Sequence, residues 1–259
     1  MNLVTFGCSW VAGVGASYDI DNPDDLETYK TYCLDNEKTE KYAWRTLLSE
    51  KYKLKNINKS KGGSANQSQF RRATRLFSNR DFNPDDTIIL WGITSYYRDE
   101  LWFNGLKMYS SFSFGDSARD NSKKYGDFSP KKYFFDHFDE EESIKSLKSN
   151  IRHWQDYFTA KGFRHYWFDI LNETNTIENH HLDFGQPGKK DLMSQLATVT
   201  GLEMLNDSYH WSSWLIDCDR IKHLERVGMV NRHSFHPTRQ GNQTICSLFD
   251  HHLKTILNV

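Results

Sequence analysis

The chain has few cysteines, and no two of them are spaced for metal binding or redox chemistry. The four cysteines, Cys8, Cys33, Cys218 and Cys246, lie far apart, so there is no CxxC motif and no zinc-ribbon or thioredoxin pattern. Isolated cysteines of this kind are typical of reduced thiols in a cytosolic protein. We therefore expect a core that forms without disulfides or a structural metal, as a chain of 259 residues can do.

Long apolar segments are also missing. No uninterrupted apolar run approaches the roughly 18 residues of a membrane-spanning helix. Met1 leads directly into a short apolar stretch, without the basic start and long apolar region of a secretory signal peptide. The sequence thus predicts a cytoplasmic protein that has no membrane partner.

The chain has no excess of charge of either sign. It carries 33 Lys and Arg against 34 Asp and Glu, a formal net charge of −1, which gives no global reason to bind nucleic acid. Aromatic residues make up 15% of the chain, which excludes disorder over most of its length. The length and composition predict a single domain over residues 1–259.

Short apolar runs alternate with amphipathic segments along the chain. Strands are predicted near 3–6, 54–57, 87–91 and 163–171. Helices are predicted over 41–52, after Ser64 as N-cap, from 139 to Gly162, near 190–200 and over 238–257. Residues 101–138 show no consistent period and are expected to be a loop-rich insertion after the third strand. This order predicts a three-layer α/β/α fold with a mainly parallel sheet.

Polar residues follow the predicted strands at the edge where parallel sheets bind ligands. Ser9 follows the first strand, Gly63 and Asn66 the second, and Thr94 the third, while His236 precedes the last helix. Together they offer a nucleophile, a base to take its proton, and donors for an oxyanion. Acyl transfer through a serine needs this set of groups.

These blocks, in this order from Gly7 to Gly241, resemble the SGNH (GDSL-like) hydrolase superfamily. The resemblance implies an SGNH-hydrolase/flavodoxin-like fold and a serine esterase without metal or organic cofactor. It makes Ser9 the nucleophile, His236 the base, and Gly63 an oxyanion donor. Thr94 stands where the family usually has asparagine, so Thr94 or Asn66 would supply the remaining donor.

Two further positions are candidates for the site, and the first is interpreted through the resemblance. His233 stands where the family usually has the aspartate that orients the base, so it is either a replacement for that acid or a solvated loop residue. Arg98 follows the third strand and either pairs with Glu100 or the nearby loop or binds an anionic group of the substrate.

The expected substrate is a small-molecule or glycan acyl ester. An acyltransferase using the same serine, and a degenerate scaffold that binds a ligand or partner, remain open alternatives.

Overall fold

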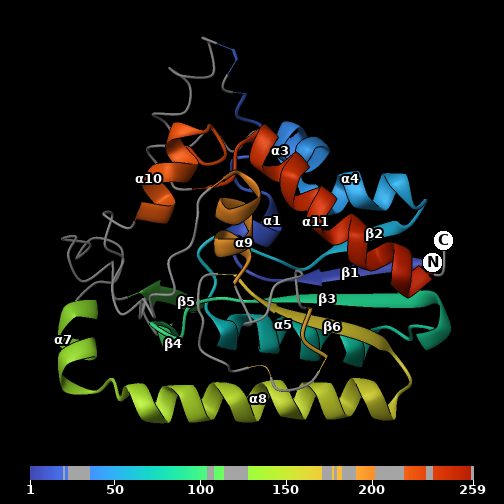
Figure 1. Ribbon diagram of the computed structural model, residues 1–259. Helices are drawn as coiled ribbons and strands as arrows, with labels where there is room; N and C mark the ends of the chain where they lie inside the picture. The colour runs from blue at the N-terminus through green and yellow to red at the C-terminus, as the bar shows by residue number, and fades with distance from the viewer. Residues whose placement is uncertain are drawn as a thin grey trace.

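The computed structural model describes residues 1–19, 21–22, 36–103, 108–113, 128–170, 177, 180–182, 191–201, 219–231 and 236–257. Its centre is a parallel sheet with the strand order β2-β1-β3-β6 (Figure 1). The strands are β1 (Asn2–Phe6), β2 (Lys55–Asn58), β3 (Thr87–Ile93) and β6 (Arg164–Asp169). The predicted parallel sheet is confirmed, and β3 is longer than expected, extending to Ile93.

Helices cover both faces of this sheet, which confirms the three-layer α/β/α architecture (Figure 1). Alternate residues of one strand enter different cores: Leu3 packs with the helices of one face, and Val4 with those of the other. The first face carries α4 (Trp44–Lys51), α9 (Leu192–Val199), α10 (Asp219–Arg226) and α11 (Arg239–Leu257), and the second carries α5 (Asn66–Asn79) and α8 (Glu140–Ala160).

Stacked aromatic rings fill both cores. On the α5 and α8 face, the Trp91 ring lies between those of Phe6 and Trp167, with centroid distances of 4.4 and 4.6 Å. On the other face, Trp44 of α4 stacks on Phe249 of α11 at 4.3 Å. Much of the chain's aromatic content is therefore structural.

The segment expected to be a loop-rich insertion contains regular structure that the sequence pattern did not reveal. Strands β4 (Arg98–Phe103) and β5 (Met108–Ser113) form an antiparallel hairpin, and α7 (Pro130–Asp136) follows it. One face of the hairpin meets α7, where the Tyr133 hydroxyl bonds the Asp99 carboxylate. The other face meets α5, where Arg71 pairs with Glu100 at 2.6 Å. Because both faces carry polar residues with tertiary partners, the strands lack the usual apolar alternation.

Other local predictions need correction. The helix predicted over 41–52 is divided into α3 (Asn36–Tyr42) and α4 by Ala43, whose backbone is extended. The N-cap of α5 is Ala65 rather than Ser64. The Ser64 hydroxyl instead donates to the carbonyls of Lys61 and Gly7, at 2.8 and 3.1 Å. The short 3-10 turn η2 (Pro84–Asp86) precedes β3.

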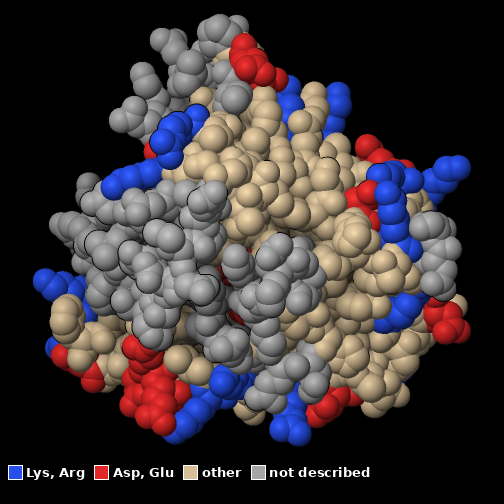
Figure 2. Space-filling view, in the orientation of Figure 1, with Lys and Arg blue, Asp and Glu red and all other residues tan. Residues whose placement is uncertain are grey.

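Charges of both signs are interspersed around the face seen in Figure 2. This agrees with the balanced overall composition. Among the described helices, none is both long and apolar enough to cross a bilayer.

Candidate active site

Ser9 is the first residue of the short helix α1 (Ser9–Ala12), which follows the carboxyl end of β1. The connection is tight, because a Cβ atom at Gly7 would lie 2.3 Å from Cγ2 of Val11. Gly13 closes the helix in the left-handed conformation, with φ of 79°, and its N–H donates to the Ser9 carbonyl. The tight turn places Ser9 at the carboxyl edge of the sheet, where it is only 5% exposed.

The glycine pair after β2 lies beside Ser9. A Cβ atom at Gly62 would lie 3.9 Å from the Cβ of Ser9. Gly63 has φ of 69°, which favours glycine, and a Cβ atom there would meet no heavy atom within 4 Å. The turn therefore brings backbone next to Ser9 and leaves open space at Gly63.

Asn66 and Thr94, both predicted as oxyanion donors, are joined to each other. The Asn66 side-chain amide donates to the Thr94 carbonyl at 2.9 Å, and its oxygen accepts from the Thr94 N–H at 3.0 Å. Asn66 is thus used in fixing the end of β3. The Thr94 hydroxyl is buried and has no hydrogen-bond partner among the described residues. Of the two side chains, Thr94 has the hydroxyl available for a bound oxyanion.

His236 lies just before α11, in a segment tied to the chain at 229–231. Its carbonyl accepts from the Asn231 N–H at 2.9 Å, and Pro237 forms an antiparallel bridge with Val230. Within the described part of the chain, the buried Nδ1 atom has no partner, so no described carboxylate orients the ring. His233 lies outside the described residues.

The environment of His236 favours its neutral form. Burial lowers the pKa of His236 to about 4, and the positive charge of Arg98 acts in the same direction. Arg98 begins β4 and is 7% exposed. A neutral imidazole at pH 7 can accept a proton, but Arg98 opposes the imidazolium that would result.

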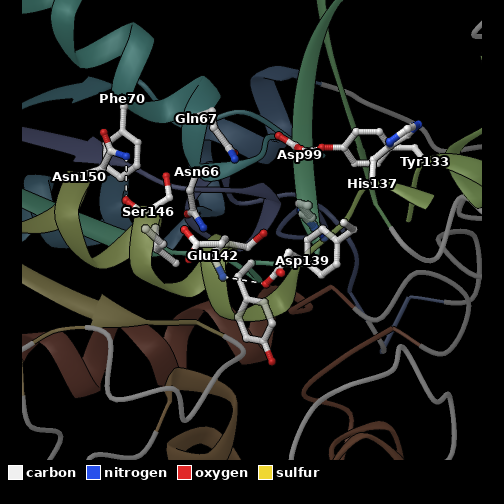
Figure 3. A pocket seen from close by; sticks show the side chains of 15 residues that line it. Asn66, Gln67, Phe70, Asp99, Tyr133, His137, Asp139, Glu142, Ser146 and Asn150 are labelled. Atoms are coloured by element: carbon white, nitrogen blue, oxygen red, sulfur yellow. Dashed lines mark hydrogen bonds between the residues drawn. The ribbon is translucent and has the colours of Figure 1, made fainter. Parts of the chain in front are cut away.

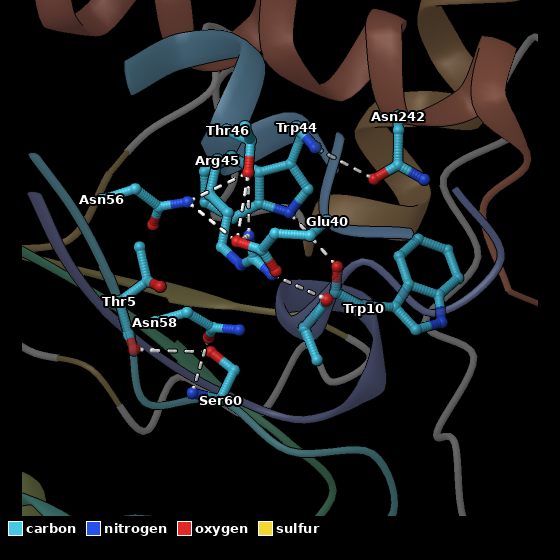
Figure 4. A network of polar contacts seen from close by, with 11 residues as sticks. Thr5, Trp10, Glu40, Trp44, Arg45, Thr46, Asn56, Asn58, Ser60 and Asn242 are labelled. Carbon is cyan, nitrogen blue, oxygen red and sulfur yellow. Dashed lines mark hydrogen bonds and ion pairs between the residues drawn. The ribbon is translucent and has the colours of Figure 1, made fainter. Parts of the chain in front are cut away.

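A chain of buried hydrogen bonds connects the segments that carry Ser9 and His236 (Figure 4). No local sequence pattern predicts it. The Asn242 amide nitrogen donates to the carbonyls of Pro237 and Thr238, at 3.0 and 2.9 Å. Its oxygen accepts from the Trp44 N–H at 3.1 Å. The Trp44 indole N–H in turn donates to the Trp10 carbonyl at 3.2 Å. The residue after each candidate catalytic group is thereby fixed to the same framework.

Arg45 adds a second support to α1. Its guanidinium donates to the Ala12 carbonyl at 3.1 Å and forms an ion pair with Glu40 (Figure 4). The Arg45 side chain is fully buried. Since carbonyls of α1 accept from the first two residues of α4, the orientation of α1 depends on where α4 begins.

Three pairs of site residues are brought together: Ser9 with Gly62, Asn66 with Thr94, and His236 with the charge of Arg98. Between Ser9 and His236, both of which are described, the structure contains no direct hydrogen bond. No group of three His, Cys, Asp or Glu side chains among the described residues is arranged to hold a metal ion.

Comparison with known proteins gives similarities of structure only. No family model matches the chain, and no curated protein matches it. A lipolytic protein of the G-D-S-L family from Desulfitobacterium hafniense DCB-2 is similar at 12% identity and a TM-score of 0.43, over 95% of this chain and 96% of that one.

Two other solved structures have the same TM-score of 0.43. One is the psychrotrophic esterase EstA from Pseudoalteromonas sp., at 13% identity over the whole of both chains. The other is a carbohydrate esterase whose active site displays divergent catalytic and non-catalytic binding functions, at 12% identity over 98% of this chain and 68% of that one. The chain is thus similar in structure to esterases and lipolytic proteins, while the assignment of each site residue rests on its own motifs and contacts.

Proposed function

We propose that the protein is a serine ester hydrolase that acts on a small or carbohydrate-linked acyl ester. The observation that carries the proposal is the position of Ser9 after the first strand of a parallel sheet, beside the Gly62–Gly63 turn. The buried Thr94 hydroxyl, which has no partner in the described structure, adds a donor at the end of the neighbouring strand.

In the proposed reaction, Ser9 Oγ attacks the ester carbonyl and its proton passes to Nε2 of His236. The N–H groups of Ser9 and Gly63, with the Thr94 hydroxyl, stabilise the oxyanion. His236 then gives the proton to the departing alcohol, which leaves an acyl group on Ser9. Water, activated by the same imidazole, releases the carboxylic acid and restores Ser9. The bonds and protons balance without a cofactor or a metal.

Arg98 also affects the proposed base. Its charge opposes protonation of His236 in the free protein. Pairing of Arg98 with an anionic substrate group is left out of the proposal, because three carboxylates, those of Asp99, Asp139 and Glu142, line the same cavity as Arg98. Arg98→Gln should change the hydrolysis of neutral and anionic esters alike, since its effect is on the pKa of His236. A change confined to esters with a free carboxylate would show instead that Arg98 binds an anionic group.

One observation favours a second candidate, a scaffold that binds a ligand without hydrolysing it. His236 Nδ1 has no partner in the described structure, and a nearby Arg98 works against its protonation. Both features weaken a catalytic base. Labelling with a fluorophosphonate separates the candidates, since an activated serine reacts and an inert one does not.

A further inference from the structure

A cavity of about 270 Å³ lies between α5 and α8 (Figure 3). We call it the α5–α8 cavity. Its walls come from the first turns of α5, the β3–β4 connection, the end of α7 and the first half of α8. Ligand sites commonly measure about 300–1,000 Å³, so this one suits a single small unit.

We infer that the α5–α8 cavity binds the polyhydroxylated alcohol part of the substrate, a unit of the size of one monosaccharide. The inference rests on the proposed ester hydrolysis and adds to it the substrate's alcohol class. Sugar hydroxyl groups both donate and accept hydrogen bonds, and the C–H faces of a sugar ring pack against aromatic rings. The cavity must supply both kinds of surface.

Neutral polar groups line much of the cavity. The side chains of Gln67 and Asn150 provide amide donors and acceptors, and Ser143 and Ser146 provide hydroxyls, while the Asn66 side chain is committed to the Thr94 backbone. Figure 3 shows Ser146 and Asn150 near Phe70. These groups match uncharged hydroxyls better than they match a fatty acyl chain.

Aromatic side chains complete the wall. Phe70, Tyr96, Tyr133 and Phe138 all contribute to the lining. Rings beside hydrogen-bonding groups offer a polyol an apolar surface together with polar partners. A monosaccharide is therefore better matched than a flexible small alcohol.

The charged groups of the cavity disfavour ionic ligands. Three carboxylates, those of Asp99, Asp139 and Glu142, repel an anion. Each of them already has a structural partner: Asp99 accepts from the Tyr133 hydroxyl, Asp139 caps α8 by accepting from the Glu142 N–H at 3.0 Å, and Glu142 pairs with Lys145 at 3.1 Å. They are consequently poor anchors for an ammonium group.

The cavity adjoins the site through two shared residues. Asn66 lines it and also binds the Thr94 backbone, and Arg98 lines it and acts on His236. A sugar held in the cavity would therefore have one side close to Thr94, where the carbonyl of an ester on that side could be held.

The test is direct binding of neutral monosaccharides to the full chain carrying Ser9→Ala, measured by saturation-transfer NMR and calorimetry. Methyl glucoside, methyl galactoside and N-acetylglucosamine serve as probes, with choline and inorganic phosphate as ionic comparisons. We expect at least one neutral sugar to bind in the millimolar range or tighter, and the ionic probes not to bind.

A matched pair of variants on α8 locates the binding. Ser146→Trp fills the cavity from an exposed helix position, and Ser149→Trp places the same ring on the exposed surface outside the lining. Ser146→Trp should weaken sugar binding at least ~10-fold, and Ser149→Trp should leave it unchanged. Equal unfolding temperatures would show that both variants fold.

Each outcome bears on one proposal. Failure of every neutral sugar to bind, preferred binding of choline or phosphate, or equal effects of the two tryptophans overturns the sugar inference. If Ser9 of the wild-type chain also fails to react with a fluorophosphonate while sugars still bind in the cavity, the cavity inference stands and ester hydrolysis is wrong. If Ser9 reacts but no sugar binds, ester hydrolysis stands and the sugar inference is wrong.

Discussion

Asn242 is the residue whose removal should most clearly separate positioning of the site from general stability. It is fully buried on α11 and bonds the Trp44 N–H and the carbonyls of Pro237 and Thr238. Asn242→Ala leaves the Trp44 N–H and the Pro237 carbonyl without this partner. The Thr238 carbonyl keeps its bond from the Asn242 backbone N–H at 2.8 Å.

The cost follows from these two groups. An unsatisfied buried donor or acceptor costs about 1–3 kcal/mol, so the free energy of unfolding should fall by about 2–6 kcal/mol. For a chain of this size, that corresponds to a melting temperature lower by about 5–20 °C. The segment holding His236 also loses its link to Trp44, and through it to Trp10. We therefore expect fluorophosphonate labelling of Ser9 at 20 °C or below to slow by ~10–100-fold, because small displacements of reacting groups are costly.

His165→Ala is the matched control. His165 accepts from the Trp167 indole N–H at 3.0 Å and bonds Thr159 Oγ1 at 3.1 Å, near the amino end of β6 and away from the site. It should lower the melting temperature by a similar amount and leave the labelling rate unchanged. Loss of stability without loss of labelling in Asn242→Ala, or equal loss of labelling in both variants, would refute the reasoning.

Three other predictions concern the site and its histidines. Thr94→Val should lower ester turnover by ~10–100-fold through loss of one oxyanion donor, with an unchanged melting temperature; unaltered turnover would remove Thr94 from the mechanism. Burial and Arg98 lower the pKa of His236 to about 4, so kcat/KM should stay constant down to about pH 4 and fall below it. Arg98→Gln should move this fall in kcat/KM to higher pH, and titration of the His236 ring by NMR should show the same rise in its pKa. Burial, with the charge of His180, also lowers the pKa of His165 to about 4. The unfolded chain binds this proton near pH 6.5, so the free energy of unfolding should fall by about 3 kcal/mol between pH 6.5 and 4. Denaturant titrations of His165→Ala at the two pH values should lack this fall.

The parallel sheet could be predicted because its strands are buried on both faces. Thr87 to Ile93 is buried throughout, and such runs are visible in a sequence. The β4–β5 hairpin could not be predicted in the same way. Its order depends on Glu100 meeting Arg71 and on Asp99 meeting Tyr133, and these pairings exist only in the folded chain.

The candidate site could be predicted in its residues but not in its geometry. The position of Ser9 after a strand and that of Gly63 in a turn follow from local patterns. That Asn66 is committed to the Thr94 backbone does not, because the two are separated by 28 positions. The division of α3 from α4 likewise escaped prediction: the N–H that begins α4 is satisfied by Asn242, 198 residues further along. Long-range caps of this kind leave no local signal.

The central claim is that Ser9 is a nucleophile activated by His236. The most direct measurement is intact-mass and peptide mapping of the full chain after incubation with a fluorophosphonate at pH 7, beside Ser9→Ala and His236→Ala. The account predicts one adduct, located on Ser9, absent in Ser9→Ala and formed at least ~10²-fold more slowly in His236→Ala. An unlabelled wild-type chain, or an adduct that persists in Ser9→Ala, would contradict it.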